Sequence, residues 1–178
     1  GSITNTATSY YTFAQGNNTT ASAQSAHAQG DSTHASGIGS HAEGQNTNAS
    51  GQYSHTEGTL TQAIGIFSHT EGYSTTANGN WSHAEGYFTT TNAGYSHAEG
   101  DTTTAAGAAS HAEGYQTTAA NSAAHSEGRS TYAGGGYSHA EGGWTKASGP
   151  YTHAEGYFTT ASAYAAHAEG GITEANGA

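Results

Sequence analysis

The stretch Tyr95-Ser96-His97-Ala98-Glu99-Gly100 decides the fold, because near copies of it recur at a fixed interval along the chain. Its histidine belongs to a series of eleven that are spaced fourteen residues apart, with no insertion or deletion. The series comprises His27, His41, His55, His69, His83, His97, His111, His125, His139, His153 and His167. A constant period of this length is typical of a coiled repeat protein rather than of a globular domain.

Each period divides into two halves of seven residues. We call the half that contains S-H-A-E-G the S half, and the other half, which follows T-x-A-x-G as in Thr145-Lys146-Ala147-Ser148-Gly149, the T half. The threonine that opens the T half recurs in every period: Thr19, Thr33, Thr47, Thr61, Thr75, Thr89, Thr103, Thr117, Thr131, Thr145, Thr159 and Thr173. Seven residues suit a strand of about five residues and a tight turn of about two.

Alternation along a strand places the side chains of each half on two faces. Serine or threonine, alanine and glycine share one face of each half, and their small size lets two sheets approach closely. We expect these residues to line the interior, and the half-terminal glycines to give the turns their backbone freedom. No helical periodicity is present. The pattern predicts an all-β parallel solenoid of about twelve 14-residue coils, with two short strands per coil.

Composition leaves one alternative to this fold. The 178-residue chain has no valine, methionine or cysteine, one leucine and five isoleucines, so its large aliphatic surface is small. Abundant glycine, serine and threonine fit a disordered linker. A linker, however, has no physical reason to keep phase over its whole length. The phase therefore favours stacked coils that bury their remaining apolar surface against copies of the same chain.

The outer positions of the two halves behave differently. In the T half the second residue varies, from His34 and Asn48 to Lys146 and Glu174, as a solvated face tolerates. In the S half the matching position is the histidine series, followed two residues later by Glu43, Glu57, Glu71, Glu85, Glu99, Glu113, Glu127, Glu141, Glu155 and Glu169. We call these two rows the His–Glu ladder. Its uniformity predicts a homo-oligomer interface in which histidine and glutamate are hydrogen-bonded within or between chains.

Aromatic residues occupy the two-residue turns. One row, Tyr53, Phe67, Trp81 and Tyr95, lies directly before the S-half serines of four consecutive coils. Rings one coil apart can pack against each other along the edge. Two interpretations stay open for this candidate contact strip: packing between coils or subunits, and an exposed strip that stacks on sugars or a protein partner.

Charge and chemistry exclude several function classes. The formal net charge is −11 with Lys146 and Arg129 as the only cations, which argues against nucleic-acid binding and against contact with acidic membranes. Eleven equivalent Ser-His-Ala-Glu copies are the opposite of one preorganised catalytic pocket, so we expect no enzyme activity and no cofactor. Histidine and carboxylate are good metal ligands, yet an even ladder gives no reason for three or four to converge, and we assign no metal site. A metal-binding ladder remains an alternative.

A solenoid that binds ice is the rival from another class. It would present a flat outer array of evenly spaced threonines, and Thr76, Thr90, Thr104 and Thr118 form one such short row in the T half. The row ends at Tyr132 on one side and at Gln62 on the other. The invariant threonines share a face with alanine and glycine, so we interpret them as interior.

The repeat resembles the YadA-like head of trimeric autotransporter adhesins, in a variant of the SHAEG type that also resembles phage-fibre and other bacterial surface proteins. The resemblance rests on the S-x-A-x-G and T-x-A-x-G halves and covers about residues 5–177. It implies a left-handed parallel β-roll in which three chains pack about a threefold axis. It also implies a role as an adhesive head or fibre segment that binds a host extracellular-matrix protein or glycan.

These expectations lead to a predicted domain organisation and cellular location. Residues 1–178 form a single repeat domain, of which residues 1–4 are a cloning remnant and cap. The chain is predicted to be an extracellular fragment of a longer anchored bacterial surface protein, with no direct membrane contact of its own.

Overall fold

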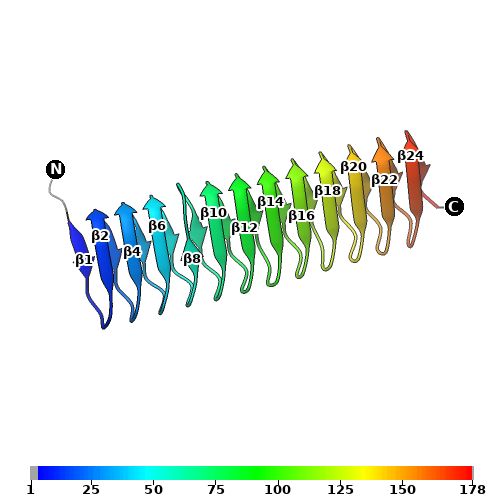
Figure 1. Ribbon diagram of the computed structural model, residues 1–178. Coiled ribbons are helices and arrows are strands. Elements are labelled where there is room, and N and C mark those ends of the chain that lie inside the picture. Colours follow the sequence, from blue (N-terminus) through cyan, green and yellow to red (C-terminus); the bar gives the residue numbers. More distant parts are fainter. Residues whose placement is uncertain (1–3, 178) are drawn as a thin grey trace. The chain divides into compact units, whose positions relative to one another are not determined.

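The computed structural model describes residues 4–177, which form two compact units, residues 4–88 and 89–177. Every regular element in this range is a β-strand, and each unit is a parallel β-solenoid of 14-residue coils, about twelve coils in the two units together (Figure 1). The prediction of an all-β solenoid is confirmed. Its left-handed winding, its trimeric state and the single-domain organisation stay predictions, and residues 1–3 of the expected remnant and cap lie outside the described residues.

In unit 1 each coil contributes one strand to each of two parallel sheets. The T-half sheet runs in the order β1 (Asn5–Ala7), β3 (Thr19–Ala21), β5 (His34–Ala35), β7 (Asn48–Ala49), β9 (Gln62–Ala63) and β11 (Thr76–Ala77). The S-half sheet runs in the order β2 (Phe13–Asn17), β4 (His27–Asp31), β6 (His41–Gln45), β8 (His55–Thr56), β10 (His69–Tyr73) and β12 (His83–Tyr87).

Unit 2 repeats the arrangement. Its T-half sheet consists of β13 (Thr90–Thr91), β15 (Thr104–Ala105), β17 (Thr118–Ala119), β19 (Tyr132–Ala133), β21 (Lys146–Ala147), β23 (Thr160–Ala161) and β25 (Glu174–Ala175). Its S-half sheet consists of β14 (His97–Asp101), β16 (His111–Tyr115), β18 (His125–Arg129), β20 (His139–Gly143), β22 (His153–Tyr157) and β24 (His167–Gly171).

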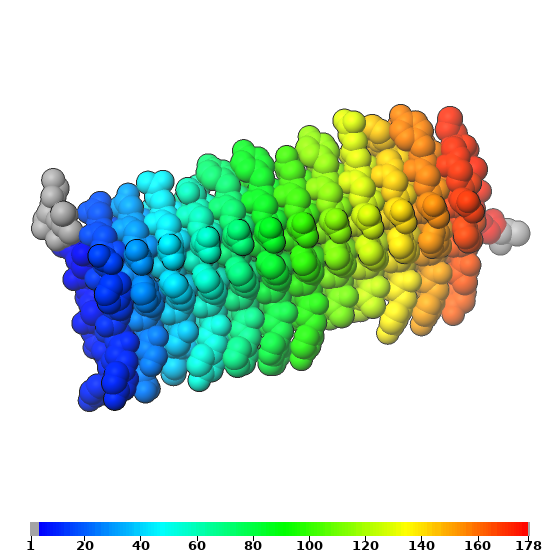
Figure 2. All heavy atoms as spheres, in the orientation of Figure 1, coloured from blue at the N-terminus to red at the C-terminus, as the bar shows by residue number. Residues whose placement is uncertain are grey.

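The two halves are unequal, which the sequence did not predict. From β4 on, S-half strands begin at the histidine, and all S-half strands except β8 are five residues long, whereas most T-half strands contain two residues. At β8 the pairing continues through bridges from Thr59 to Gln45 and Tyr73. The register places each residue beside its equivalent fourteen positions on, as His97 beside His111. Side chains of equivalent residues therefore form continuous rows over each unit (Figure 2).

The interior consists of small side chains, as predicted. Alanines of both halves are 0% exposed in most coils, and eleven of the twelve T-half threonines are buried, Thr173 being half-buried. The two rows of buried hydroxyls differ. Several S-half hydroxyls donate to the carbonyl three residues earlier, as Ser110 does to Gly107 at 2.7 Å, although that of Ser40 has no partner among the described residues. T-half hydroxyls such as that of Thr103 are buried with no hydrogen-bond partner among the described residues.

The turn residues correct one expectation. The backbone becomes left-handed at the residue before each S-half serine and at the residue before each T-half threonine, and these residues are rarely glycine: Tyr53 has φ 56° and Phe88 has φ 51°. The glycines that end the S half do use the freedom of glycine, as Gly100 does with φ 111°, but the glycines of both halves have a second role. A Cβ on Gly100 or Gly107 would overlap a backbone carbonyl of the next coil. These glycines permit close stacking of coils, and backbone hydrogen bonds between coils hold the turns, as from the Tyr53 amide to the Ile38 carbonyl at 2.8 Å.

Candidate functional site

The histidine row lies on the outer face of the S-half sheet and forms a stack of imidazoles. Ring centroids of successive coils are between 4.5 and 4.9 Å apart in both units. Parallel pairing in exact coil register produces this spacing, since equivalent side chains of adjacent strands lie one strand separation apart. The rings of His55 and His69 are inclined by only 2°. Phe13 extends the stack of unit 1 at its first coil.

The glutamate row runs beside the imidazoles. In nine coils the histidine Nε2 lies 3.5–3.9 Å from the Oε2 of the glutamate two residues further along the strand. These separations exceed a hydrogen bond, so the expected hydrogen bonds do not form within the chain for these pairs. The two side chains leave the same strand face side by side, and the contact is electrostatic.

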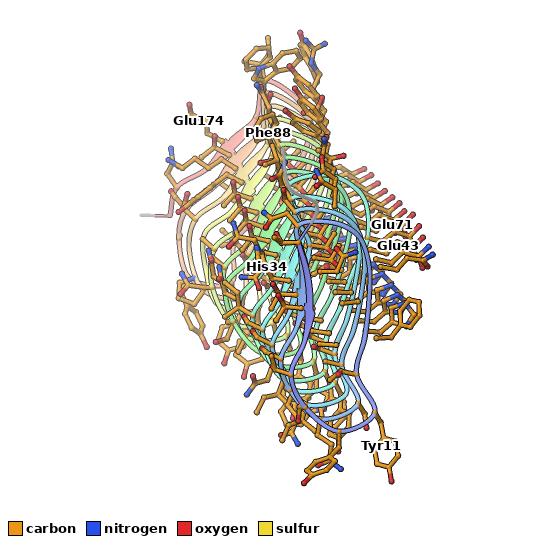
Figure 3. The ribbon with its side chains drawn as sticks, turned by 90° about the vertical axis from the view of Figure 1, so that its left-hand side faces the viewer. Tyr11, His34, Glu43, Glu71, Phe88 and Glu174 are labelled. Carbon is orange, nitrogen blue, oxygen red and sulfur yellow. The ribbon has the colours of Figure 1, made fainter. Side chains whose placement is uncertain are left out.

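Exposure differs between the two rows. In the inner coils the histidine side chains are 34–39% exposed and the glutamates 43–53%. The Nε2 atoms of His41, His69 and His111, however, are covered and have no hydrogen-bond partner among the described residues. Figure 3 shows Glu43 and Glu71 in one row projecting from this face of unit 1. The ladder is thus a half-exposed, regular surface of stacked rings bordered by carboxylates.

Burial makes three histidines of the ladder less basic. The pKa of His41, of His69 and of His125 lies below the ordinary value of 6.5, chiefly because burial disfavours the charged ring. The flanking imidazoles lower the pKa further, and the glutamate two residues on opposes this effect. The neutral form of these rings is therefore the one that the fold favours.

The two turn edges carry aromatic rows. Tyr53, Phe67 and Trp81 stack along one edge of unit 1 with centroids 5.1 and 6.0 Å apart, and each side chain is about half exposed. Tyr95, the fourth residue of the predicted strip, lies in unit 2 and is 65% exposed. Within the stack the ring faces are covered by neighbouring rings. The stack therefore offers ring edges, which weakens the interpretation that it binds sugars by face-to-face stacking.

Further aromatic rows lie at other turns. In unit 1, Tyr73 and Tyr87 stack at 5.3 Å, and Phe88 meets both rings edge-on. Figure 3 shows Phe88 and Tyr11 at opposite edges of unit 1. In unit 2 the Arg129 guanidinium lies 4.7 Å from the ring centre of Trp144. The exposed aromatics at both edges make the turns, and not the sheet faces, the apolar part of the surface.

A polar groove crosses the outer T-half face of unit 1, where sequence reasoning placed no site. Its volume is about 750 Å³, and its lining includes Asn46, Asn48, Leu60, Gln62 and His34. Two rows meet there, the left-handed residues before each T-half threonine and the outward residues after it. The clustering of Asn18, Asn46, Asn48 and Gln62 within four periods was the available signal.

The structure adds no support for the metal-binding and ice-binding alternatives. Among residues 4–177 no group of three or more histidine, aspartate or glutamate side chains could hold a metal ion. The T-half threonines that recur in every period lie in the interior and cannot form an ice-binding face. On the outer face of unit 2, the threonines in consecutive coils are Thr90, Thr104 and Thr118. No helix in the described part of the chain has the length and apolar character needed to cross a membrane.

Comparison with known proteins identifies no relative: no family model matches the chain, and no curated protein does. The resemblance to YadA-like heads therefore stays a prediction that rests on the repeat itself.

Proposed function

We propose that the chain is a rigid, non-enzymatic head or fibre segment of a bacterial or phage surface protein. It assembles as a homotrimer through the His–Glu ladder and adheres to an extracellular-matrix protein or glycan of a host. The trimer number, the adhesive role and the extracellular location, as part of a longer anchored chain, follow from the resemblance to YadA-like heads. The location of the subunit interface is argued from the surface of the S-half sheet.

The observation that carries the proposal is the uniform, half-exposed imidazole stack. Stacked rings bordered by carboxylates recur from coil to coil, and the covered Nε2 atoms of His41, His69, His111 and His125 have no hydrogen-bond partner among the described residues. A surface that meets bulk water has no physical need for such repetition. A sister subunit has the same 14-residue period and would supply equivalent partners to every coil.

The same repetition supports the absence of enzyme activity. Catalysis requires one group activated by a unique environment. Each histidine of the inner ladder instead has a neighbouring ring above and below and a glutamate at the side, so no copy differs chemically from the next. Binding by such a molecule is expected to be distributed over many coils.

Sedimentation of the purified chain tests the assembly. We expect a trimer, which Glu113→Arg together with Glu127→Arg should dissociate, because two bulky guanidinium groups would then be buried in the interface without an anionic partner. The matched control is Thr104→Arg with Thr118→Arg, on the outer T-half face, which should remain trimeric. A monodisperse wild-type monomer at micromolar concentration would refute the interface.

Adhesion needs a separate measurement. Beads coated with the wild-type chain should be retained on immobilised extracellular-matrix proteins or on glycan-coated surfaces more than beads coated with albumin. Equal retention on every surface would refute the adhesive role, even if the chain is trimeric. A thermal hysteresis measurement on the same sample decides the alternative, since clear activity would make the chain an ice-binding protein.

A further inference from the structure

We propose that the amide-lined groove of unit 1 is a binding site for a neutral oligosaccharide. The inference rests on the adhesive role proposed above and gives it a location and a ligand class. The groove lies on the T-half face, away from the His–Glu ladder: Figure 3 shows His34 on the side of unit 1 opposite the row of Glu43 and Glu71.

The first argument is the chemistry of the lining. Asn46, Asn48 and Gln62 line the groove with primary amides, to which Ser32 and His34 add further polar groups. An amide is both donor and acceptor, as is each hydroxyl of a sugar, so one side chain can pair with either role of a hydroxyl. Leu60 supplies one apolar contact for the C–H groups of a sugar ring.

The second argument is that these amides are available. The side chains of Asn46, Asn48 and Gln62 make no hydrogen bond to other groups in the part of the chain that the structure describes. Elsewhere in the chain such amides are used internally, as where the Asn80 side chain accepts from the Ile66 amide at 2.8 Å. Unused amides in a groove can bind a ligand without first breaking a contact within the protein.

The third argument is rigidity. The rim residues Asn46 and Leu60 are left-handed, with φ 54° and 59°. Their backbone amides donate to the preceding coil, to Asp31 at 2.8 Å and to Gln45 at 2.9 Å. The rows therefore hold a fixed spacing of one coil, about 4.8 Å. Successive rings of an extended β-linked sugar chain advance by a comparable distance, and little freedom is lost when such a ligand binds.

Charge decides which sugar chains are accepted. Aspartate, glutamate, lysine and arginine do not line the groove, while the whole chain has a net charge of −11. An anionic glycan would meet repulsion with no cation to bind it, whereas a neutral one would not. An extended peptide fits less well, because the sheet's backbone groups are already used between coils, as in the bond from the Asn48 amide to the Thr61 carbonyl.

Unit 2 supplies the matched control, because its equivalent positions lack the amide cluster. The outward residues corresponding to Asn48 and Gln62 are Thr104 and Thr118 among others, followed by Tyr132 and Lys146. The same coils and the same backbone thus present a different surface there. If the amides carry recognition, only substitutions in unit 1 should weaken it.

The experiment titrates the intact chain with linear hexasaccharides of glucose, galactose and N-acetylglucosamine, followed by the side-chain amide signals in NMR and by calorimetry. We expect at least one neutral hexasaccharide to bind and to shift the amide signals of Asn48 and Gln62. Asn48→Ala and Gln62→Ala should each weaken binding by about fivefold, the loss typical of one neutral hydrogen bond. Thr104→Ala and Thr118→Ala should leave the affinity unchanged. Circular dichroism and thermal midpoint confirm that the variants are folded.

Three results would overturn the inference: no hexasaccharide binds at millimolar concentration, the amide variants bind as well as the wild type, or a peptide library yields ligands for the groove while the sugars do not. The bead assay keeps this failure distinct from failure of the proposed function. Retention that survives in Asn48→Ala with Gln62→Ala leaves adhesion standing and removes the groove from it.

Discussion

The two outer faces of each solenoid unit share one backbone plan but carry opposite kinds of surface. In unit 2 all six S-half strands present histidine at the second position of the half, while the T-half strands present Thr90, Thr104, Thr118, Tyr132, Lys146, Thr160 and Glu174. Both rows are paired in the same parallel register. The fold alone therefore does not demand a uniform outer row, and this contrast is the reason for proposing that the His–Glu ladder meets a sister subunit.

The largest difference between the halves is expected at their glycines. Gly100 in the S half has φ 111° and would also overlap the Gly114 carbonyl if it carried a Cβ, whereas Gly107 in the T half has only the overlap problem. Gly100→Ala should therefore cost about 3 kcal/mol or more, from strain and overpacking together. Gly107→Ala should cost less.

Denaturant unfolding measures both changes, with Gly143→Ala as the control. Gly143 is not left-handed, and its added Cβ would meet only the Tyr157 ring at 3.2 Å. A change within about 0.5 kcal/mol is expected there. Equal losses at Gly100 and Gly143 would contradict the close-stacking role of the half-terminal glycines.

The second difference is the pH dependence that the His–Glu ladder gives to the S-half face. Because the pKa values of His41, His69 and His125 lie below the ordinary 6.5, the unfolded chain binds more protons than the folded one in that range. The free energy of unfolding should be highest above about pH 6.5 and should decrease as the pH falls toward 5. Thermal midpoints at pH 8 and pH 5 measure it.

A paired substitution assigns the pH effect to the ladder. His125→Gln should reduce the loss of stability between pH 8 and pH 5, since one ring with a lowered pKa is removed. Thr118→Gln places the same side chain on the outer T-half face without removing a titratable group, and should leave the pH dependence as it is. A midpoint that is flat from pH 5 to pH 8 in the wild type would contradict the assignment.

The third difference is between the buried hydroxyl rows. Ser110→Ala removes the hydrogen bond to the Gly107 carbonyl and should cost about 1 kcal/mol. Thr103→Val removes a hydroxyl that is buried without a partner, at nearly constant volume, and should be neutral or stabilising by up to about 1 kcal/mol. Denaturant midpoints compare the two variants directly, and a clear loss for Thr103→Val would reveal a hydrogen bond that the T row does make.

The smallest effect is expected on the outer T-half face. Thr118→Lys should change stability by less than about 0.5 kcal/mol, because Lys146 occupies the equivalent position two coils on. His111→Lys should cost more, since it interrupts the imidazole stack with His97 and His125, whose centroids lie 4.9 and 4.8 Å away. Equal tolerance at the two sites would remove the distinction between the faces.

Much of the fold could be predicted from the repeat. The period gives the coil, alternation gives the interior alanines and threonines, and the constancy of His97 and its equivalents identifies the distinctive face. The unequal strand lengths could not be predicted, because they depend on how far adjacent coils stay within hydrogen-bonding distance. Bulky residues such as Phe88 and Trp81 at left-handed turns were also missed, since local preference disfavours them and bonds between coils override it.

The candidate sites were less accessible to sequence reasoning. The row of His41 and its equivalents could be identified, but not the absence of hydrogen bonds to Glu43 and its equivalents, which depends on the 3.5–3.9 Å offset of parallel side chains. The groove that includes Asn48 and Gln62 forms where two rows of side chains meet on the outer T-half face, the row before the T-half threonines and the row after them. A linear pattern does not show which rows become neighbours in space.

Exact coil register has a consequence for how such a molecule changes length. Because every strand pairs with its equivalent fourteen residues away, as His139 with His153, removing or duplicating one whole coil leaves the repeated histidine, glutamate and glycine of the S half beside residues of their own type. A gene that recombines between its own repeats can therefore shorten or extend the protein in steps of about 4.8 Å while these repeated contacts are kept. Reach becomes a heritable quantity that varies independently of what the surface recognises.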